Sequence, residues 1–459
     1  MKFSFRKLAV ASSLFSCFLF AEEDLSLNNN ETEQDLQISQ VETETLKGNQ
    51  ELAQSGVDRD VVDQVDIEAL RDWINTKRQV TVKELGGRLS ISGEVRTELQ
   101  STNERKNAKR QRGSGGEVSG VPTRAYDIEV NLMLDYRADR TWAAIKLEFD
   151  NNAGNISGTF NRLTLERAFF GVRAIQGDTF TTDVELGRRR LNYTFDSRIE
   201  FGSFMDGILV KYDHALDFLG DFYIHGGPFV INEKKDQYGW VGEVGLLGLG
   251  NTGFYTKYSL IDWDTKNLHN SIENRRFQFL NSQWILGYKF VPRKWNKTVT
   301  CYAAGLLNHA ATGRPLVEKD AAGNVVKKVN LTNGKKANWA AYIGFSMGEV
   351  RKVGDWSLDV NYQWVAAQSI PGFDAAGIGR GNAADVGFYT KKPDGTGGLN
   401  DRSDAVGFTN YKGLSIELLY LMTNNLTLMQ GWRQSVTLDK DIGPLLRYKQ
   451  YEIELIYAF

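Results

Sequence analysis

The last nine residues of the chain read Tyr451-Glu452-Ile453-Glu454-Leu455-Ile456-Tyr457-Ala458-Phe459. Every second side chain is aromatic or aliphatic, and the final residue is itself aromatic. A period of two is typical of a β-strand with two different faces. A soluble edge strand can alternate in the same way, but it would rarely expose a terminal Phe. The pattern therefore predicts a strand with a lipid-facing side formed by Tyr451, Ile453, Leu455, Tyr457 and Phe459.

The same period of two runs backwards from this strand to about residue 86 and predicts about sixteen strands. Alternate connections between them are short, such as Asp139-Arg140, Gln176-Gly177 and Gly250-Asn251. The connections in between are longer, notably 101–123, 311–335 and 370–410. Tight turns at one end and extended loops at the other are typical of a transmembrane barrel. We therefore expect an all-β fold, an antiparallel transmembrane β-barrel over residues 86–459.

The composition agrees with strands that have one wet and one apolar face. The chain is 12% aromatic, yet its mean hydropathy is -0.38. Beyond the extreme N-terminus it has no run of about 18 apolar residues, so the sequence contains no candidate for a membrane-spanning helix in the mature chain. Trp356 and Trp364 stand at the two ends of one predicted strand, as two aromatic belts would require. Any membrane crossing is thus predicted to use strands.

The N-terminal 85 residues have a different character. Lys2, Arg6 and Lys7 precede an apolar stretch, so residues 1–21 are predicted to be a cleaved signal peptide. A rival interpretation makes Cys17 a lipidated residue. Residues 22–85 are predicted to form an acidic, partly disordered periplasmic extension, because residues 22–82 hold 15 acidic and 5 basic side chains.

Within this extension, residues 57–77 carry a helical apolar face. Such a helix could plug the barrel, bind the cell wall, help trimerisation, or only tether the barrel. With an even number of strands, both chain termini are predicted to be periplasmic.

Residues for catalysis or metal binding are not apparent in the sequence. The four histidines are outside every metal or nucleophile motif, and no cofactor-binding pattern is present. We therefore expect no enzymatic activity, no cofactor and no metal, and we expect no nucleic-acid partner. An energy-coupled receptor would need about 22 strands and a plug, for which this chain is too short.

Two segments carry a resemblance to known proteins. The terminal strand resembles the signature that outer-membrane proteins present to the barrel assembly machinery. Residues 165–173 and 184–188 look like strands of the sixteen-stranded Gram-negative outer-membrane porins, in which a Gly-Arg step precedes the loop that narrows the pore. The overall arrangement also looks like porin-like proteins of the chlamydial type. These resemblances imply an outer-membrane barrel, a homotrimer, and outer-membrane lipid and small polar solutes as partners.

The porin resemblance directs attention to the connection 188–199. Folded into the lumen, it would place an electropositive constriction at Arg188, Arg190, Asp196 and Arg198. The alternative is a solvated external turn that pairs with surface lipid phosphates. General porins differ, because their constriction loop is longer and often acidic. Alternation predicts further lumen-lining side chains, which are Glu129, Arg137, Lys146, Glu148, Glu185, Asp359, Glu417, Glu452 and Glu454.

Both signs of charge occur among these lumen candidates, so the lining should give at most a moderate ion preference. The function expected from these features is passive diffusion of ions and small hydrophilic solutes through the outer membrane. The alternative is a surface adhesin or structural barrel without an open pore. The largest loops show no obvious binding module, which favours the channel.

Overall fold

The computed structural model describes residues 80–82, 88–118, 121–152, 161–217, 219–250, 252–263, 278–295, 297–313, 316–319, 322–329, 334–381, 408–442 and 444–459. All of them belong to one compact unit, Gln64–Phe459. The predicted signal peptide, the acidic extension up to residue 79 and the 57–77 helix lie outside the described residues. Among the described residues, no helix is long and apolar enough to cross a membrane.

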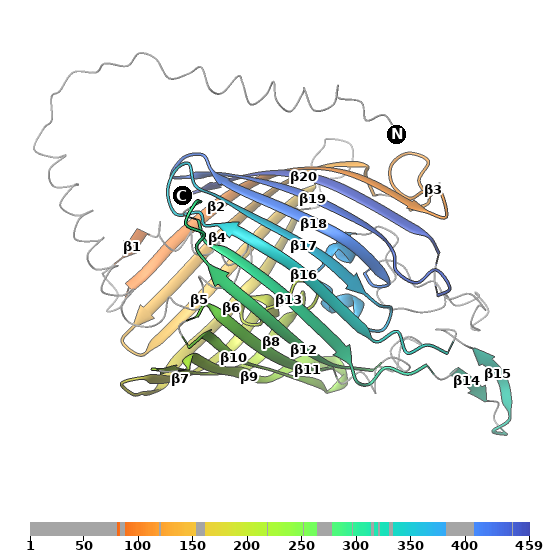
Figure 1. Cartoon of the computed structure of the whole chain (residues 1–459), viewed down its shortest axis with the longest axis horizontal. Helices are drawn as coiled ribbons and strands as arrows, with labels where there is room; N and C mark the ends of the chain where they lie inside the picture. Colours follow the sequence, from red (N-terminus) through yellow and green to blue (C-terminus); the bar gives the residue numbers. More distant parts are fainter. Residues whose placement is uncertain are drawn as a thin grey trace, which may run out of the picture. The chain divides into compact units, whose positions relative to one another are not determined.

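Sixteen antiparallel strands close into a barrel, as the alternation predicted (Figure 1). Each strand pairs with the next along the chain, and the first pairs with the last. Their bounds are β2 (Arg88–Lys106), β4 (Arg124–Ala138), β5 (Thr141–Asn152), β6 (Asn161–Gln176), β7 (Phe180–Arg190), β8 (Phe204–Leu216), β9 (Gly220–Asn232), β10 (Gln237–Leu249), β11 (Phe254–Trp263), β12 (Phe279–Phe290), β13 (Val299–Asn308), β16 (Trp339–Gly348), β17 (Trp356–Val365), β18 (Tyr411–Leu421), β19 (Leu426–Thr437) and β20 (Leu446–Ala458).

Four short strands accompany the barrel. β1 (Val80–Val82) and β3 (Lys109–Arg110) both pair with β2. β14 (Leu316–Lys319) and β15 (Val325–Val329) pair only with each other, as a hairpin inside the connection predicted to be a long loop. Figure 1 shows this hairpin at the end of the barrel where the long connections gather. We call this end the loop end, and the opposite one, which holds the C-terminus, the turn end.

The two faces of the barrel wall differ as the alternation requires. Outward-facing side chains are apolar and exposed, for example Phe170 at 59% and Trp284 at 57%. Outward aromatics gather towards both ends, with Trp240 and Trp339 near the loop end and Tyr457 near the turn end. Side chains that face the interior are largely polar or charged. A wall with an apolar outside and a charged inside is the arrangement of a membrane barrel rather than of a soluble β-protein.

The barrel closes between β2 and β20, over the thirteen register pairs from Glu94↔Ala458 to Lys106↔Leu446. The final residue extends this pairing, because the Gly93 and Phe459 backbones exchange two hydrogen bonds of 2.9 Å. A Cβ at Gly93 would lie 2.6 Å from the Phe459 ring. Gly93 therefore leaves the space that the terminal ring occupies on the outer face of the barrel.

We predict that Gly93→Val displaces the Phe459 ring and destabilises closure by about 1–3 kcal/mol, as overpacking usually does. The temperature at which the folded barrel converts to the unfolded form, followed by gel mobility, should fall. Val95→Ile adds bulk at the next outward position of the same strand and is the control. Equal transition temperatures for the two variants would contradict this role of Gly93.

Candidate pore constriction

The connection between β7 and β8 folds into the barrel interior. We call residues 191–203 the inner loop; it starts with the 3₁₀ turn η2 (Leu191–Tyr193). Backbone hydrogen bonds from Leu191 N to Ser203 O (2.9 Å) and from Asn192 N to Phe201 O (3.1 Å) hold its two ends together. The loop thus leaves the wall and returns to it at nearly the same place.

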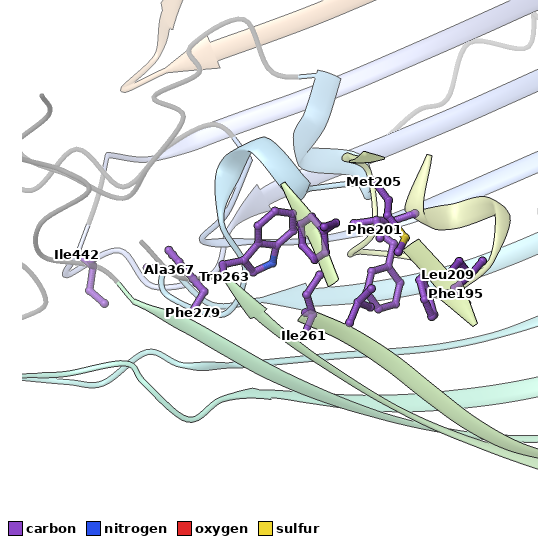
Figure 2. Packing of buried hydrophobic residues seen from close by; sticks show 12 residues of the cluster. Phe195, Phe201, Met205, Leu209, Ile261, Trp263, Phe279, Ala367 and Ile442 are labelled. Atoms are coloured by element: carbon purple, nitrogen blue, oxygen red, sulfur yellow. The ribbon is translucent and has the colours of Figure 1, made fainter. Parts of the chain in front are cut away.

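Apolar side chains explain why the inner loop turns inwards. Leu191, Phe195 and Phe201 are completely buried against interior-facing residues of the wall. Figure 2 shows Phe195 and Phe201 beside Met205 and Leu209 of β8. The cluster continues along the interior to Trp263 and Phe279. Burying each large apolar side chain contributes roughly 1.5–3 kcal/mol, so this packing favours the inward position strongly.

Polar contacts fix the tip of the inner loop to one side of the wall. Asp196 accepts from Lys257 Nζ of β11 at 3.2 Å, and its backbone oxygen accepts from Gln283 Nε2 of β12 at 2.7 Å. Arg198 pairs with Asp359 of β17 at 3.2 Å.

Further contacts of the inner loop tip lie between β10 and β17. Ser197 Oγ donates to Gln283 Oε1 at 2.8 Å. The Arg198 guanidinium lies 5.2 Å from the centre of the Tyr302 ring of β13, within cation–π range. The Asp196 backbone N–H donates to Glu243 Oε2 of β10 at 3.3 Å. The tip therefore lies along the wall from β10 to β17, across the lumen from β2.

A second inward segment begins where β17 ends. Residues 366–381, which we call the inner segment, contain the 3₁₀ turns η4 (Gly372–Asp374) and η5 (Ile378–Gly381). Ile370, Ala375 and Ile378 are buried with Ile199 of the inner loop. The segment occupies the interior beside β13, β16 and β18.

The inner loop and the inner segment pair with each other through Asp374. Its two carboxylate oxygens accept from the backbone N–H groups of Phe201 (3.2 Å) and Ser203 (3.0 Å). Its backbone oxygen accepts from Gly202 N at 2.9 Å, and Ala376 N donates to Ile199 O at 3.0 Å. Ser203 Oγ also donates to Phe373 O at 3.0 Å. Five hydrogen bonds thus join two segments that are about 170 residues apart in the sequence, so their positions depend on each other.

Glu200 lies at this junction and is 1% exposed. Asn281 of β12 donates a hydrogen bond to Glu200, and the Glu200 backbone N–H donates to Ser197 Oγ at 3.0 Å. Burial raises the pKa of the Glu200 carboxyl well above its usual range, and the Asp374 carboxylate raises it further. The neutral form is therefore favoured when the two segments are docked.

The arginine cluster predicted from the sequence is divided between the two faces of the wall. Arg188 and Arg190 belong to β7, so the loop begins only at Leu191. Arg188 pairs with Asp206 of β8 at 2.6 Å, in register with the outward-facing positions of both strands. Arg190 pairs with Glu166, which also binds Lys146 at 2.8 Å in the interior. Asp196 and Arg198 are the two candidates that the inner loop itself carries.

Most of the predicted lumen-lining side chains lie on the interior face of their strands. Glu452 pairs with Arg433 at 2.7 Å, and both Glu129 and Glu454 contact Arg96, at 3.1 and 3.7 Å. The same face also carries Lys146, Glu148, Glu185, Asp359 and Glu417. Arg137 is exposed near the end of β4, at the turn end. The alternate residues Tyr451, Ile453, Leu455, Tyr457 and Phe459 lie on the outer face.

Several interior groups were not among the candidates. Arg96, Lys257 and Arg433 lie in strands, and alternation alone could have identified them. Arg167 could not be placed in this way, because Glu166 is an extra residue in β6 that shifts the register with β5 between Lys146 and Leu147. Arg167 lies 4.5 Å from the centre of the Tyr193 ring of the inner loop. No sequence signal pointed to Glu200 or Asp374.

The described part of the chain contains no cluster of three or more His, Cys, Asp or Glu residues that could hold a metal ion. The interior chemistry is instead that of paired charges and amides. Such a lining can order water and exert a transverse field on a passing solute.

Comparison with known proteins gives matches only among solved structures. No known family profile matches the chain, and no curated protein sequence does. The similar structures are Gram-negative outer-membrane porins and channels. The chain resembles them in fold. A chlamydial-type relationship stays a prediction.

Three of these structures show the extent of the likeness. Salmonella typhi OmpF in complex with daunomycin is 12% identical, with 83% of this chain and 100% of that chain covered and a TM-score of 0.45. The outer-membrane channel DcaP of Acinetobacter baumannii is 11% identical, with 82% and 99% covered and a TM-score of 0.44. The high-pH structure of Pseudomonas putida OprB is 9% identical, with 81% and 94% covered and a TM-score of 0.46.

We predict that docking of the inner loop weakens as the pH rises. Glu200 has its folded pKa raised, so its favourable contribution is complete below the ordinary value near 4.5 and is lost as the pH rises through the raised pKa. Hydrogen exchange of the 195–203 backbone, corrected for the intrinsic pH effect, should accelerate as the pH rises through this raised pKa. Glu200→Gln keeps an acceptor for Asn281 without a charge, so it should remove this acceleration.

Asp374→Asn is the matched variant for the same measurement. It replaces one accepting oxygen by an amide group, so the 195–203 backbone should exchange faster at every pH. An acceleration with rising pH that persists in Glu200→Gln would contradict the assignment to Glu200.

Proposed function

We propose that this protein is a porin that allows passive diffusion of ions and small hydrophilic solutes across the outer membrane. The observation that carries the proposal is the asymmetric interior. The polar contacts of the inner loop tip go to the arc of wall from β10 to β17. On the facing arc, from β19 to β5, charges such as Arg96 and Arg433 pair with wall carboxylates. A charged wall that faces an inward loop is the arrangement that a diffusion channel needs.

The proposed location follows from the same architecture. We propose export with a cleaved signal peptide, both termini in the periplasm and the loop end outside the cell. Assembly into a homotrimer, and delivery by the barrel assembly machinery through Tyr451 to Phe459, are parts of the same proposal. The outward aromatic positions of the final strand are exposed, which supports such a recognition role for them.

A barrel without an open pore is the second candidate. The observation that favours it is the docking of two inward segments, which buries Glu200 and Asp374 together with several apolar side chains inside the barrel. The protein would then act as a structural or adhesive surface barrel.

Conductance distinguishes these two functions. Purified full-length protein inserted into a planar bilayer should produce stepwise current increases, because each inserted barrel adds a water-filled path. A reversal potential measured under a salt gradient then reports the ion preference. Barrels that are folded by circular dichroism but carry no current would exclude the porin and favour the closed barrel.

The interior and exterior arginines should affect this current differently. Arg190→Ala removes one of the two cations that contact Glu166, so the reversal potential should move towards cation preference. Arg188→Ala is the matched control, because Arg188 pairs with Asp206 on the outer face. A shift in the control as large as in Arg190→Ala would show that Arg188 also acts on the lumen.

A further inference from the structure

Basic side chains form a lateral row on the outer face at the loop end. Strand register aligns Lys412 of β18 with Val436 of β19, and Val436 with Arg447 of β20. Arg447 is opposite Arg105 of β2, and Arg105 is opposite Arg110 of β3. Directly paired positions share a face, with Cβ atoms about 4.5–5.5 Å apart. Four cations therefore lie in one row across five adjacent strands, which Figure 1 shows side by side.

The orientation of this row follows from the alternation along β20. Arg447, Lys449 and Tyr451 are exposed, whereas the residues between them are buried in the interior. Lys449 lies one outward position below the row, and Tyr451 lies one position further towards the turn end. Arg105 is exposed as well. The cations thus point away from the lumen.

Arg105 and Arg447 face each other with like charges. Like charges directly opposite in a sheet are destabilising. Among the ion pairs between described residues, none includes Arg105, Arg447 or Lys449. The arrangement is unfavourable by itself and becomes favourable when an anion lies between the guanidinium groups.

The row is at the height of lipid headgroups. Two outward positions from the row towards the turn end, Trp432 of β19 is paired with Tyr451 of β20. At about 3.3 Å per residue, these aromatic rings are roughly 13 Å along the strand from the cations. Aromatic residues mark the boundary of the hydrocarbon layer, so the cations beyond them meet the headgroup layer.

Another part of the loop end differs in its outward charges. There Arg188 already has a partner, because it binds Asp206 through two hydrogen bonds of 2.6 and 2.7 Å. The outward-facing position of β11 nearest its loop end is the carboxylate Asp262. The row from β18 to β2 therefore differs from these two positions, where the outward charge is either already paired or negative.

We infer that the outer face of β18, β20 and β2 binds the phosphate groups of an anionic glycolipid in the outer leaflet through Arg105, Arg447 and Lys449. Arginine offers several N–H donors in a planar fork that matches phosphate geometry. The strands below supply the apolar surface for the acyl chains. The inference rests on the membrane location proposed above and goes beyond the channel function.

The test uses detergent-purified full-length protein and bisphosphorylated lipid A as the probe, with bound lipid counted by native mass spectrometry. Each basic residue near an anionic surface contributes about 1 kcal/mol. The triple variant Arg105→Gln, Arg447→Gln, Lys449→Gln should therefore bind roughly 100-fold more weakly. Binding by the unmodified protein should also fall as salt is raised, because salt screens exposed charges.

Three controls make the outcome specific. Arg188→Gln changes an outward arginine that is already paired and should bind lipid A normally. Lipid A without its phosphates should bind weakly to every variant. Equal binding of the two lipids, unchanged binding in the triple variant, or displacement by millimolar inorganic phosphate would each overturn the inference. The planar-bilayer current of the triple variant is measured separately, so failure of the channel proposal is recognised independently of lipid binding.

Discussion

The hydrogen-bonded seam between β2 and β20 is the constraint on which the rest of the structure depends. A sheet in a hydrocarbon layer cannot leave backbone N–H and C=O groups unpaired, since each unpaired group costs several kcal/mol. Closure pairs the two edges that would otherwise remain, and it brings the two ends of the described barrel together. Once the ring is closed, every side chain must face either the lipid or the lumen. The period of two in the sequence then decides which residues line each space.

The lumen imposes a second constraint, because a sixteen-stranded ring is too wide for its own side chains to fill. Here the inner loop and the inner segment occupy part of that space. Both apolar packing and polar contacts hold them there. Apolar residues of the inner loop pack against the wall, while Asp196, Arg198 and Asp374 provide directed polar contacts. Since Asp374 binds backbone amides rather than side chains, it fixes the path of the inner loop without using the charges that could act on a solute.

The sequence predicted the parts of the fold that depend on local alternation. The sixteen strands, the even count and the apolar outer face of the final strand follow from neighbours two residues apart, and the structure has all of them. Strand ends were less accurate. Residues 101–106 contain no apolar side chain, so nothing in their pattern indicated that β2 continues to Lys106. That extension is held by its pairing with β20, which is far away in the sequence.

The site was predictable only where it lies on regular strands. Lumen carboxylates such as Glu452 and Glu454 could be assigned by parity, whereas the bulge beside Arg167 breaks the parity rule. Arg188 to Arg190 appear as one cluster in the sequence, but strand geometry turns only Arg189 inwards, to Glu185. Arg188 binds Asp206 on the outer face, whereas the Arg190 side chain reaches the interior Glu166. Asp374 has no local signal at all, since its role arises from a contact with Phe201 across 173 positions.

Charges on the outer face of the barrel are compensated differently from charges in the lumen. Residues inside the barrel can neutralise one another across the lumen or between adjacent strands, as Arg96 does with Glu129 and Glu454. An outward cation has only lateral neighbours on the same face, and at Arg105 and Arg447 those neighbours are also cations. Among the described residues, no carboxylate forms an ion pair with either arginine, which is why we infer that a lipid phosphate supplies the compensating charge. A membrane barrel can therefore be electrostatically incomplete on its outer face, and the position of that deficit indicates where the surrounding lipid contributes to its stability.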